Sequence, residues 1–191
     1  MTNRTTLSML AILALAATLG CADPTSPQTG QVQVLLTDAP IDLSAVSAVN
    51  VTVDSIELFQ ADTPDDDGME MQRPGVETGE GLTLNLLDFQ NGETTVIAML
   101  DAPAGDYRKL RMHVRAAELV RQDPGDATLS IVETIFVPSG KVDIPVPFTV
   151  AGGETTEVTL DFDAALSVQV NETPGGHLYI LRPVIVPVSV K

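Results

Sequence analysis

The chain has 191 residues, with ten Lys and Arg against 26 Asp and Glu, and its formal charge at pH 7 is −16. Such an acidic surface disfavours nucleic acid and phosphate-rich ligands, whereas divalent cations and basic partner surfaces remain compatible with it. The chain has one cysteine, which excludes a fold held together by several internal disulfides.

Residues 1–20 have the pattern of a secretory signal peptide. Arg4 supplies a short positive region, and the apolar run from Leu7 to Leu15 is too short to span a bilayer. No charged residue lies between Arg4 and Cys21. We therefore expect residues 1–20 to be removed during export. Without Arg4, nine Lys and Arg oppose the 26 Asp and Glu, so the mature charge is −17.

Cys21 is the only cysteine, and a lone thiol fits three roles: a buried free side chain, half of an intermolecular disulfide, or a lipid attachment point. The residues before it, ATLG, resemble a bacterial lipobox, whose cysteine is acylated and becomes the first residue. Ala22 is not an Asp, which by resemblance to Gram-negative lipoproteins favours the outer membrane. We expect a lipid anchor at Cys21, a tether over residues 21–30, and a domain in the periplasm or at the cell surface.

Residues 31–191 have the pattern of one domain of short β-strands. Val, Thr, Ile and Leu alternate with polar residues in runs that Gly, Pro, Asp and Asn separate: GQVQVLLT, VNVTV, LTLNLL, TTVIAML, KLRMHV, TLSIVETIFV, EVTLDF and LYILRPVIVPV. Such alternation buries one face of a strand and leaves the other in solvent. We predict an all-β fold, an antiparallel β-sandwich of about eight or nine strands.

The triplet Asp-Ala-Pro ends two of these runs, at Asp38 and at Asp101. Asp accepts hydrogen bonds from backbone N–H groups just downstream, and proline keeps the preceding residue out of the helical region. Both triplets therefore predict turns, with a ligand site as the alternative.

The strand after each triplet slips in phase. Alternation changes face between Val53 and Ile56 in the first strand, and between Val114 and Leu119 in the second. A phase slip inside a strand is typical of a β-bulge, so we predict one bulge in each.

Two segments carry prolines at even spacing. Pro145 and Pro147 are two residues apart, and Pro183 and Pro187 are four apart in the last predicted strand. Because proline cannot donate to a strand ladder, we predict that both segments lie at sheet edges with the proline side unpaired.

Several segments together resemble one family: VQVLLTDAPID, VNVTVDSIEL, LNLLDFQNG, PAGDYRKLRM, LDFDAALSV and YILRPVI. Over most of residues 30–186 the chain is similar to bacterial envelope lipoproteins of the domain-of-unknown-function 4382 family. The resemblance implies a transthyretin-like or immunoglobulin-like β-sandwich on a lipid anchor. It implies no known activity and assigns no catalytic residue.

The strongest metal candidate is an acidic loop. Asp65, Asp66 and Asp67 are consecutive, and Glu70 follows closely. Calcium binds six to eight oxygens, some of which adjacent carboxylates can supply. The alternating acidic positions of an EF-hand are absent, so a solvated hairpin tip is the competing interpretation.

The residues needed for catalysis or for strong glycan binding are scarce. His113 lies inside a predicted strand and His177 in a predicted turn, and neither has a nucleophile motif nearby. The chain has no Trp, so Tyr107 and Tyr179 are the best candidates for stacking on a sugar. We predict that the protein is not an enzyme and needs no cofactor, calcium excepted.

One basic strip stands out from the acidic background. With period two, Lys109, Arg111, His113 and Arg115 share one strand face. The strip is either a patch for an anion or an acidic partner, or a set of cross-strand ion pairs. We favour ion pairs, with Glu157, Asp161 or Asp54 as the partners, because such pairs commonly populate an exposed sheet face.

The sequence therefore predicts a lipid-anchored, non-catalytic module that binds or scaffolds at the cell envelope. Its partner is an envelope protein or a glycan. The alternative is a calcium- or carbohydrate-binding accessory domain.

Overall fold

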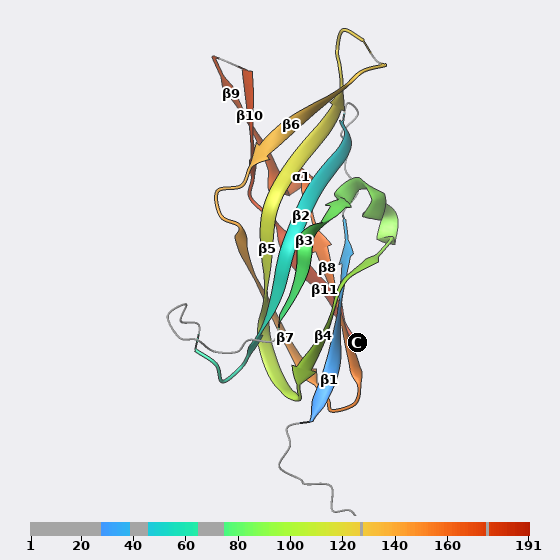
Figure 1. The fold of residues 1–191 in the computed structure, drawn as a ribbon, viewed down its shortest axis with the longest axis vertical. Coiled ribbons are helices and arrows are strands. Elements are labelled where there is room, and N and C mark those ends of the chain that lie inside the picture. The colour runs from blue at the N-terminus through green and yellow to red at the C-terminus, as the bar shows by residue number, and fades with distance from the viewer. Residues whose placement is uncertain (1–27, 39–45, 65–74, 127, 175) are drawn as a thin grey trace, which may run out of the picture.

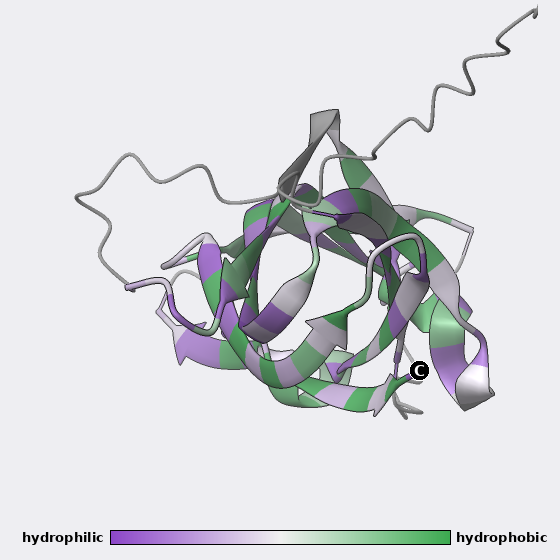
Figure 2. Cartoon of the chain, turned by 90° about the horizontal axis from the view of Figure 1, so that it is seen from below, coloured by the Kyte–Doolittle hydropathy of each residue, from purple (hydrophilic) through white to green (hydrophobic). Residues whose placement is uncertain are grey.

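The protein is a β-sandwich, as predicted (Figure 1). The computed structural model describes residues 28–38, 46–64, 75–126, 128–174 and 176–191. Viewed from below, the two sheets curve toward each other around the interior, and hydrophobic and hydrophilic residues alternate along their strands (Figure 2). That alternation is the pattern from which the fold was predicted.

One sheet, sheet A, has four strands in the order β11-β8-β1-β4. Its strands are β1 (Thr29–Thr37), β4 (Thr95–Pro103), β8 (Thr155–Phe162) and β11 (Ile185–Val190). The pair of β1 and β8 is parallel, whereas β1–β4 and β8–β11 are antiparallel.

The other sheet, sheet B, has the order β3-β2-β5-β6-β10-β9, and β7 also pairs with β5. Its strands are β2 (Val46–Gln60), β3 (Gly75–Asn85), β5 (Gly105–Gln122), β6 (Ser130–Phe136), β7 (Lys141–Val150), β9 (Val168–Thr173) and β10 (Gly176–Leu181). The long strand β5 organises this sheet, because one of its edges pairs with β2 and the other pairs first with β7 and then with β6.

The core lies between the sheets and is built from the inward residues of both. The predicted alternation holds: Val158, Leu160 and Phe162 of β8 are buried, and so is Phe148 of β7. Two short helical segments, η1 (Leu86–Gly92) and α1 (Ala164–Ser167), connect strands. In the described part of the chain no helix is long and apolar enough to cross a membrane.

The predicted strand number and strand directions need correction. The described chain has eleven strands rather than eight or nine, because KVDIPVPFTV forms β7, VQVNET forms β9 and the last predicted strand divides into β10 and β11. The division falls at 182–184, where Pro183 has no N–H to donate and the chain passes from sheet B to sheet A. Both sheets are mixed rather than antiparallel, since β1–β8 and β6–β10 run parallel.

The prolines lie at sheet edges, with one exception. β7, which contains Pro145 and Pro147, pairs only with β5, and β11, which contains Pro187, pairs only with β8. These assignments confirm the edge prediction, whereas Pro183 lies in the link between strands. β7 and β11 are also near each other at one corner of the sandwich, although no ladder joins them in the described residues. Prolines on both edges explain why the two sheets stay separate there.

Both predicted bulges are present, and they are adjacent. Asp54 is the extra residue of β2, since Val53 pairs with Val114 and Ser55 with His113. Arg115 is the extra residue of β5, because Ala116 pairs with Thr52. Gly81 of β3 lies over this irregularity with a φ of +96°, where a Cβ would lie 2.6 Å from Thr52 Cγ2.

The two Asp-Ala-Pro triplets have different structures. Asp38 follows β1, is 3% exposed, and accepts a hydrogen bond at 3.0 Å from the backbone N–H of Ala164, the first residue of α1. Its contact is therefore a tertiary one, and residues 39–45 lie outside the described chain. Asp101 is exposed inside β4, opposite Gln31, so the turn prediction is wrong there. The chain turns only after Pro103, the last residue of β4.

The described domain is elongated, and its two poles differ. β1 begins at the pole that is lowest in Figure 1. The connections from β5 to β6 and from β9 to β10 lie at the opposite pole (Figure 1). The basic strip lies on the outer face of sheet B between these poles.

Candidate functional site

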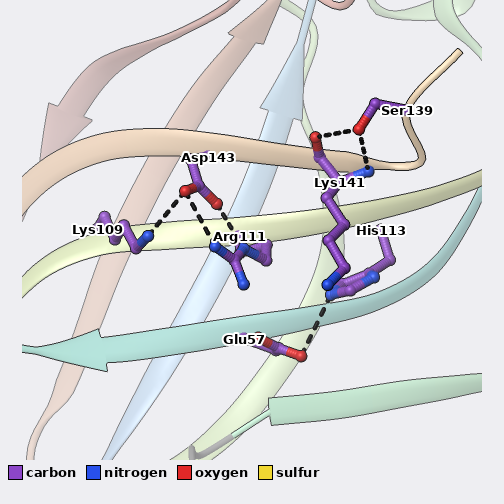
Figure 3. A network of polar contacts seen from close by, with 7 residues as sticks. All are labelled: Glu57, Lys109, Arg111, His113, Ser139, Lys141 and Asp143. Carbon is purple, nitrogen blue, oxygen red and sulfur yellow. Dashed lines mark hydrogen bonds and ion pairs between the residues drawn. The ribbon is translucent and has the colours of Figure 1, made fainter. Parts of the chain in front are cut away.

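The basic strip lies on β5 between two neighbouring strands that carry acids (Figure 3). Glu57 of β2 pairs in register with Arg111 on one side, and Asp143 of β7 pairs with Arg111 on the other. Because Leu110, Met112 and Val114 are buried in the core, the side chains between them point to the outer face. The predicted common face of the strip is therefore correct.

Asp143 joins the first two cations of the strip. Its Oδ2 accepts from Lys109 Nζ at 2.7 Å and from Arg111 Nη2 at 3.1 Å, and its Oδ1 accepts from Arg111 Nε at 2.5 Å. The Arg111 guanidinium thus binds the Asp143 carboxylate through two hydrogen bonds. This bidentate arrangement is the strong form of the pair, and it fixes the orientation of both groups. Three side chains from β5 and β7 form one ionic cluster, which we call the Asp143 cluster.

Phe59 of β2 packs against both cations of the Asp143 cluster. Lys109 Nζ lies 4.2 Å from the centroid of the Phe59 ring, and Arg111 Cζ lies 4.9 Å from it. Phe59 is fully buried, Lys109 is 5% exposed and Arg111 is 7% exposed. An aromatic face attracts cations at this range, and the attraction grows when water is excluded. These two residues are therefore buried structural cations rather than members of an exposed strip.

The electrostatics of Asp143 follow from these partners. Hydrogen bonding to Arg111 holds the pKa of the Asp143 carboxyl well below its usual value; desolvation opposes this, and Lys109 reinforces it. Asp143 is consequently ionised at any physiological pH, and its charge is balanced locally by Lys109 and Arg111.

The third residue of the strip, His113, faces a different acid. Its Nε2 lies 3.2 Å from Glu57 Oε1. On the side of β7, the aliphatic chain of Lys141 runs beside the His113 ring (Figure 3), in keeping with the register that pairs the two residues. His113 thus lies between a carboxylate on β2 and a cation on β7.

The fourth residue, Arg115, pairs with Asp54 across the two bulges, through Arg115 Nη2 and Asp54 Oδ1. Both side chains are about half exposed, at 46% and 42%. Of the three predicted acidic partners, Asp54 is correct. Glu157 and Asp161 are wrong, because both belong to β8 in sheet A.

A cavity of about 510 Å³ adjoins the Asp143 cluster at the corner where β7 begins. Its lining comes from the turn before β7 and the start of β7, and from the end of β10 and the link that follows it: Pro138, Ser139, Lys141, Val142, Asp143, Leu181, Arg182 and Pro183. We call it the corner cavity. Its two cationic residues are Lys141 and Arg182, and both are exposed.

The turn that frames the corner cavity has a fixed backbone. Gly140 O accepts a hydrogen bond from Val114 N at 2.7 Å. A Cβ at Gly140 would lie only 2.8 Å from the carbonyl oxygen of Val114. Ser139 Oγ accepts from the backbone N–H of Lys141 at 3.3 Å. The Val114 backbone therefore holds Gly140, and the Ser139 hydroxyl holds the backbone of Lys141.

Sequence reasoning missed the other half of this site. Asp143, Lys141 and Phe59 each belong to a recognisable strand, but nothing in the sequence places β7 beside the first half of β5. The outward parity of Asp143 with Pro145 in KVDIPVPF was the available signal. That parity indicates an exposed acid but does not identify its partner.

The candidate lipidation and calcium residues lie outside the part of the chain that the structure describes. Cys21, Asp65, Asp66, Asp67 and Glu70 lie outside the described residues, so lipidation and calcium binding stay predictions. Among the described residues, no group of three or more His, Cys, Asp and Glu could hold a metal.

The two tyrosines are unsuited to stacking on a sugar. Tyr107 is 2% exposed and stacks on Phe148 with ring centroids 5.1 Å apart, and burial raises its pKa. Tyr179 is 8% exposed and forms a tilted pair with His177. His177 is exposed in β10 rather than in the predicted turn.

A comparison with known proteins gives one match. The family described as a domain of unknown function, DUF4382, matches residues 29–183. No curated protein and no solved structure matches the chain.

Proposed function

The chain belongs to the DUF4382 family, and from that premise we propose that it is a lipid-anchored, non-catalytic module that binds a partner at the bacterial cell envelope. The proposal rests on two features, the lipobox-like segment that ends at Cys21 and the elongated domain that follows it.

The observation that carries the proposal is the place where the domain begins. β1 starts at Thr29, only eight positions after Cys21, at one pole of an elongated sandwich. At ~3.3 Å per residue, such a tether spans at most about 26 Å. An acylated Cys21 would therefore hold this pole near the membrane and direct the opposite pole, with the connections β5–β6 and β9–β10, away from it.

A binding role is supported by how the charged side chains are used. On the outer face of sheet B, Lys109 and Arg111 share Asp143, and His113 faces Glu57. These ion pairs hold the side chains of this face in fixed positions, as a preformed binding surface requires. Next to them, the corner cavity offers a preformed concave surface.

The anchor is tested with the full chain in a Gram-negative host. We expect Cys21→Ser to abolish labelling by a palmitate analogue and to leave the protein unprocessed or free of membranes. Ala22→Asp should keep the label but move the protein to the inner-membrane fraction of a sucrose gradient. Ser26→Ala, a tether substitution, serves as the control and should change neither readout. Normal maturation and membrane association of Cys21→Ser would overturn the proposal.

We also propose that the sandwich is of the immunoglobulin-like or transthyretin-like kind. Tyr107 at the start of β5 donates its hydroxyl hydrogen bond at 2.9 Å to the backbone oxygen of Pro103, four residues upstream. A tyrosine that bonds back across a strand connection in this way is typical of the tyrosine corner of immunoglobulin-like domains. An experimental structure tests this, since a strand order that matches neither class would contradict it.

A further inference from the structure

We propose that the outer face of sheet B, at the pole opposite the start of β1, packs against the same face of a second copy of this chain. The face is formed by the outward residues of β6, β9 and β10 and of β5 from Ala116 to Gln122, and we call it the distal face. The inference names the partner that the proposed binding function requires, and it uses the proposed anchor to orient the two copies.

The centre of the distal face is an exposed aromatic side chain. Ile135 of β6 and Tyr179 of β10 are buried, so the residues that follow them, Phe136 and Ile180, point outward. Phe136 and Ile180 are register partners on the two parallel strands. Phe136 is nevertheless 57% exposed, because no strand or helix of the described chain packs over this side of the sheet.

Three more apolar residues extend this pair across the sheet. Val132 of β6 lies opposite Val120 of β5 and is 59% exposed. Leu178 of β10 is 43% exposed and lies two residues before Ile180, so it points to the same side. Neighbours across strands touch directly or along the diagonal, so these side chains form one patch over β5, β6 and β10. A contiguous exposed apolar patch marks an interaction site.

The distal face is almost free of charge, although the chain carries a large excess of acid. Along its four strands, all of which the structure describes, the outward positions include one charged side chain, that of Glu118. The other polar side chains of the face are neutral: Gln122, Ser130, Thr134, Gln169, Asn171 and Thr173. Depletion of charge around an exposed aromatic residue is the composition of an interface core.

This neutrality determines which partner fits. A basic partner would be attracted by the acids of the chain but would find only Glu118 on this face. An acidic partner would be repelled by the net charge and would meet no unpaired cation on the face. A second copy presents the same apolar and neutral polar groups, so two such faces can meet with few charges to desolvate.

The proposed anchor brings the distal faces of two copies to the same height. β1 and β5 begin at the same pole, since Thr29 pairs with Pro103 and β5 starts at Gly105. β5 runs along the long axis of the domain (Figure 1), and its stretch Ala116–Val120 lies about 36–50 Å from Gly105 at ~3.3 Å per residue. Two copies tethered to one membrane can therefore join these faces about a two-fold axis normal to the membrane, the commonest symmetry of dimers.

The size of the distal face predicts a weak dimer. The face is four strands wide and six or seven residues long. At ~4.8 Å between strands and ~3.3 Å per residue, it covers roughly 400 Å². A standard stable interface buries ~800 Å² on each partner. We therefore expect association that is weak in dilute solution and depends on the high local concentration that a shared membrane provides.

The test is thiol crosslinking of the full acylated chain in isolated membranes. Cys21 is the only native cysteine, so Thr134→Cys introduces one available thiol, beside the apolar patch. With a short bismaleimide we expect this variant to give a covalent dimer of the chain, identified by mass. Asp101→Cys, at an exposed position on the outer face of sheet A, is the control and should remain monomeric.

Charge substitutions in the Thr134→Cys background test the patch itself. Phe136→Glu and Val132→Glu should each lower the crosslinked fraction at least about tenfold, as loss of a central interface contact implies. Val186→Glu is the matched control, because it adds the same charge at an apolar residue of sheet A that is 49% exposed, and it should change nothing. Raising the salt concentration from 0.1 to 1 M shortens the Debye length from ~10 to ~3 Å and should increase crosslinking, since it screens the repulsion between acidic copies.

Four results would overturn the inference. One is the absence of a crosslink in Thr134→Cys protein that unfolds in urea like the wild type. Another is equal crosslinking of Asp101→Cys, or crosslinking that Phe136→Glu leaves unchanged, because either would indicate random collision. Crosslinking that falls as salt rises would indicate an ionic contact. A covalent product with a different protein would assign the distal face to that protein.

The failure of this inference and the failure of the proposed anchor are distinguishable. Phe136→Glu should lose the dimer but stay in the membrane fraction. Cys21→Ser combined with Thr134→Cys should leave the membrane fraction and still crosslink through the distal face, at higher protein concentration. Membrane association of that double variant would contradict the anchor alone.

Discussion

The two halves of the basic strip have the same sequence pattern but different surroundings. Lys109 and Arg111 are buried over Phe59 and share Asp143, whereas His113 and Arg115 are partly exposed and have separate partners, Glu57 and Asp54. The alternation of cations along a strand therefore does not determine how strongly each cation binds its acidic partner. Burial and the number of partners decide that, because a desolvated charge without its counterion is costly and a solvated one is not.

The largest expected effect is loss of the counterion in the buried half. Asp143→Ala leaves Lys109 and Arg111 buried without their shared carboxylate, so we expect the free energy of unfolding to fall by about 2–4 kcal/mol. Urea denaturation measures this. Asp143→Asn, which keeps one acceptor oxygen, should lose less. A change below about 0.5 kcal/mol for Asp143→Ala, the level of ordinary surface substitutions, would show that the two halves are equivalent.

The two Asp-Ala-Pro triplets extend the comparison from cations to acids. Asp38→Ala removes the buried acceptor of the Ala164 N–H, and we expect a loss of about 2 kcal/mol in thermal or urea unfolding. Asp38→Asn keeps an oxygen in place and should lose less than half of that. Asp101→Ala is the matched control in an exposed strand position and should change stability by less than about 0.5 kcal/mol. Equal losses at both positions would contradict the structural difference between the triplets.

Acid should weaken the buried half in a defined pH range. The folded pKa of Asp143 lies below its ordinary value of 3.8, so its contribution is present above that value and is lost as the pH falls through the folded pKa. We expect the stability difference between the wild type and Asp143→Asn to be constant from pH 7 to about pH 5. It should shrink at lower pH. A difference that already shrinks between pH 7 and pH 6 would show that a group other than Asp143 carries the effect.

The smallest effect is expected in the exposed half. Arg115→Gln and Asp54→Asn should each lower stability by less than about 1 kcal/mol, since both side chains are about half exposed. The loss should largely disappear at 1 M salt, where the Debye length is only ~3 Å. The Asp143→Ala loss should be less sensitive to salt, because Lys109 and Arg111 are buried even though the Asp143 side chain is 43% exposed. Equal salt sensitivity of the two variants would remove the distinction between the halves.

Local features of the sandwich were predictable because they depend on neighbouring residues. Period-two alternation identified which side chains are buried, the phase slips located the bulges at Asp54 and Arg115, and the prolines of β7 and β11 predicted edge strands. Each feature follows from the pleat of a strand or from a missing N–H.

Tertiary structure alone decided which distant segments meet. The sequence determined a sandwich and the outward face of the basic strip, but not that β7 would bring Asp143 between Lys109 and Arg111. Nor did it determine that Asp38 would reach Ala164, or that the link at Arg182 would lie beside Lys141 and frame the corner cavity. The physical reason is that alternation specifies only which side of a strand is buried. Strand order depends on the packing of the whole core, which no local stretch of residues determines.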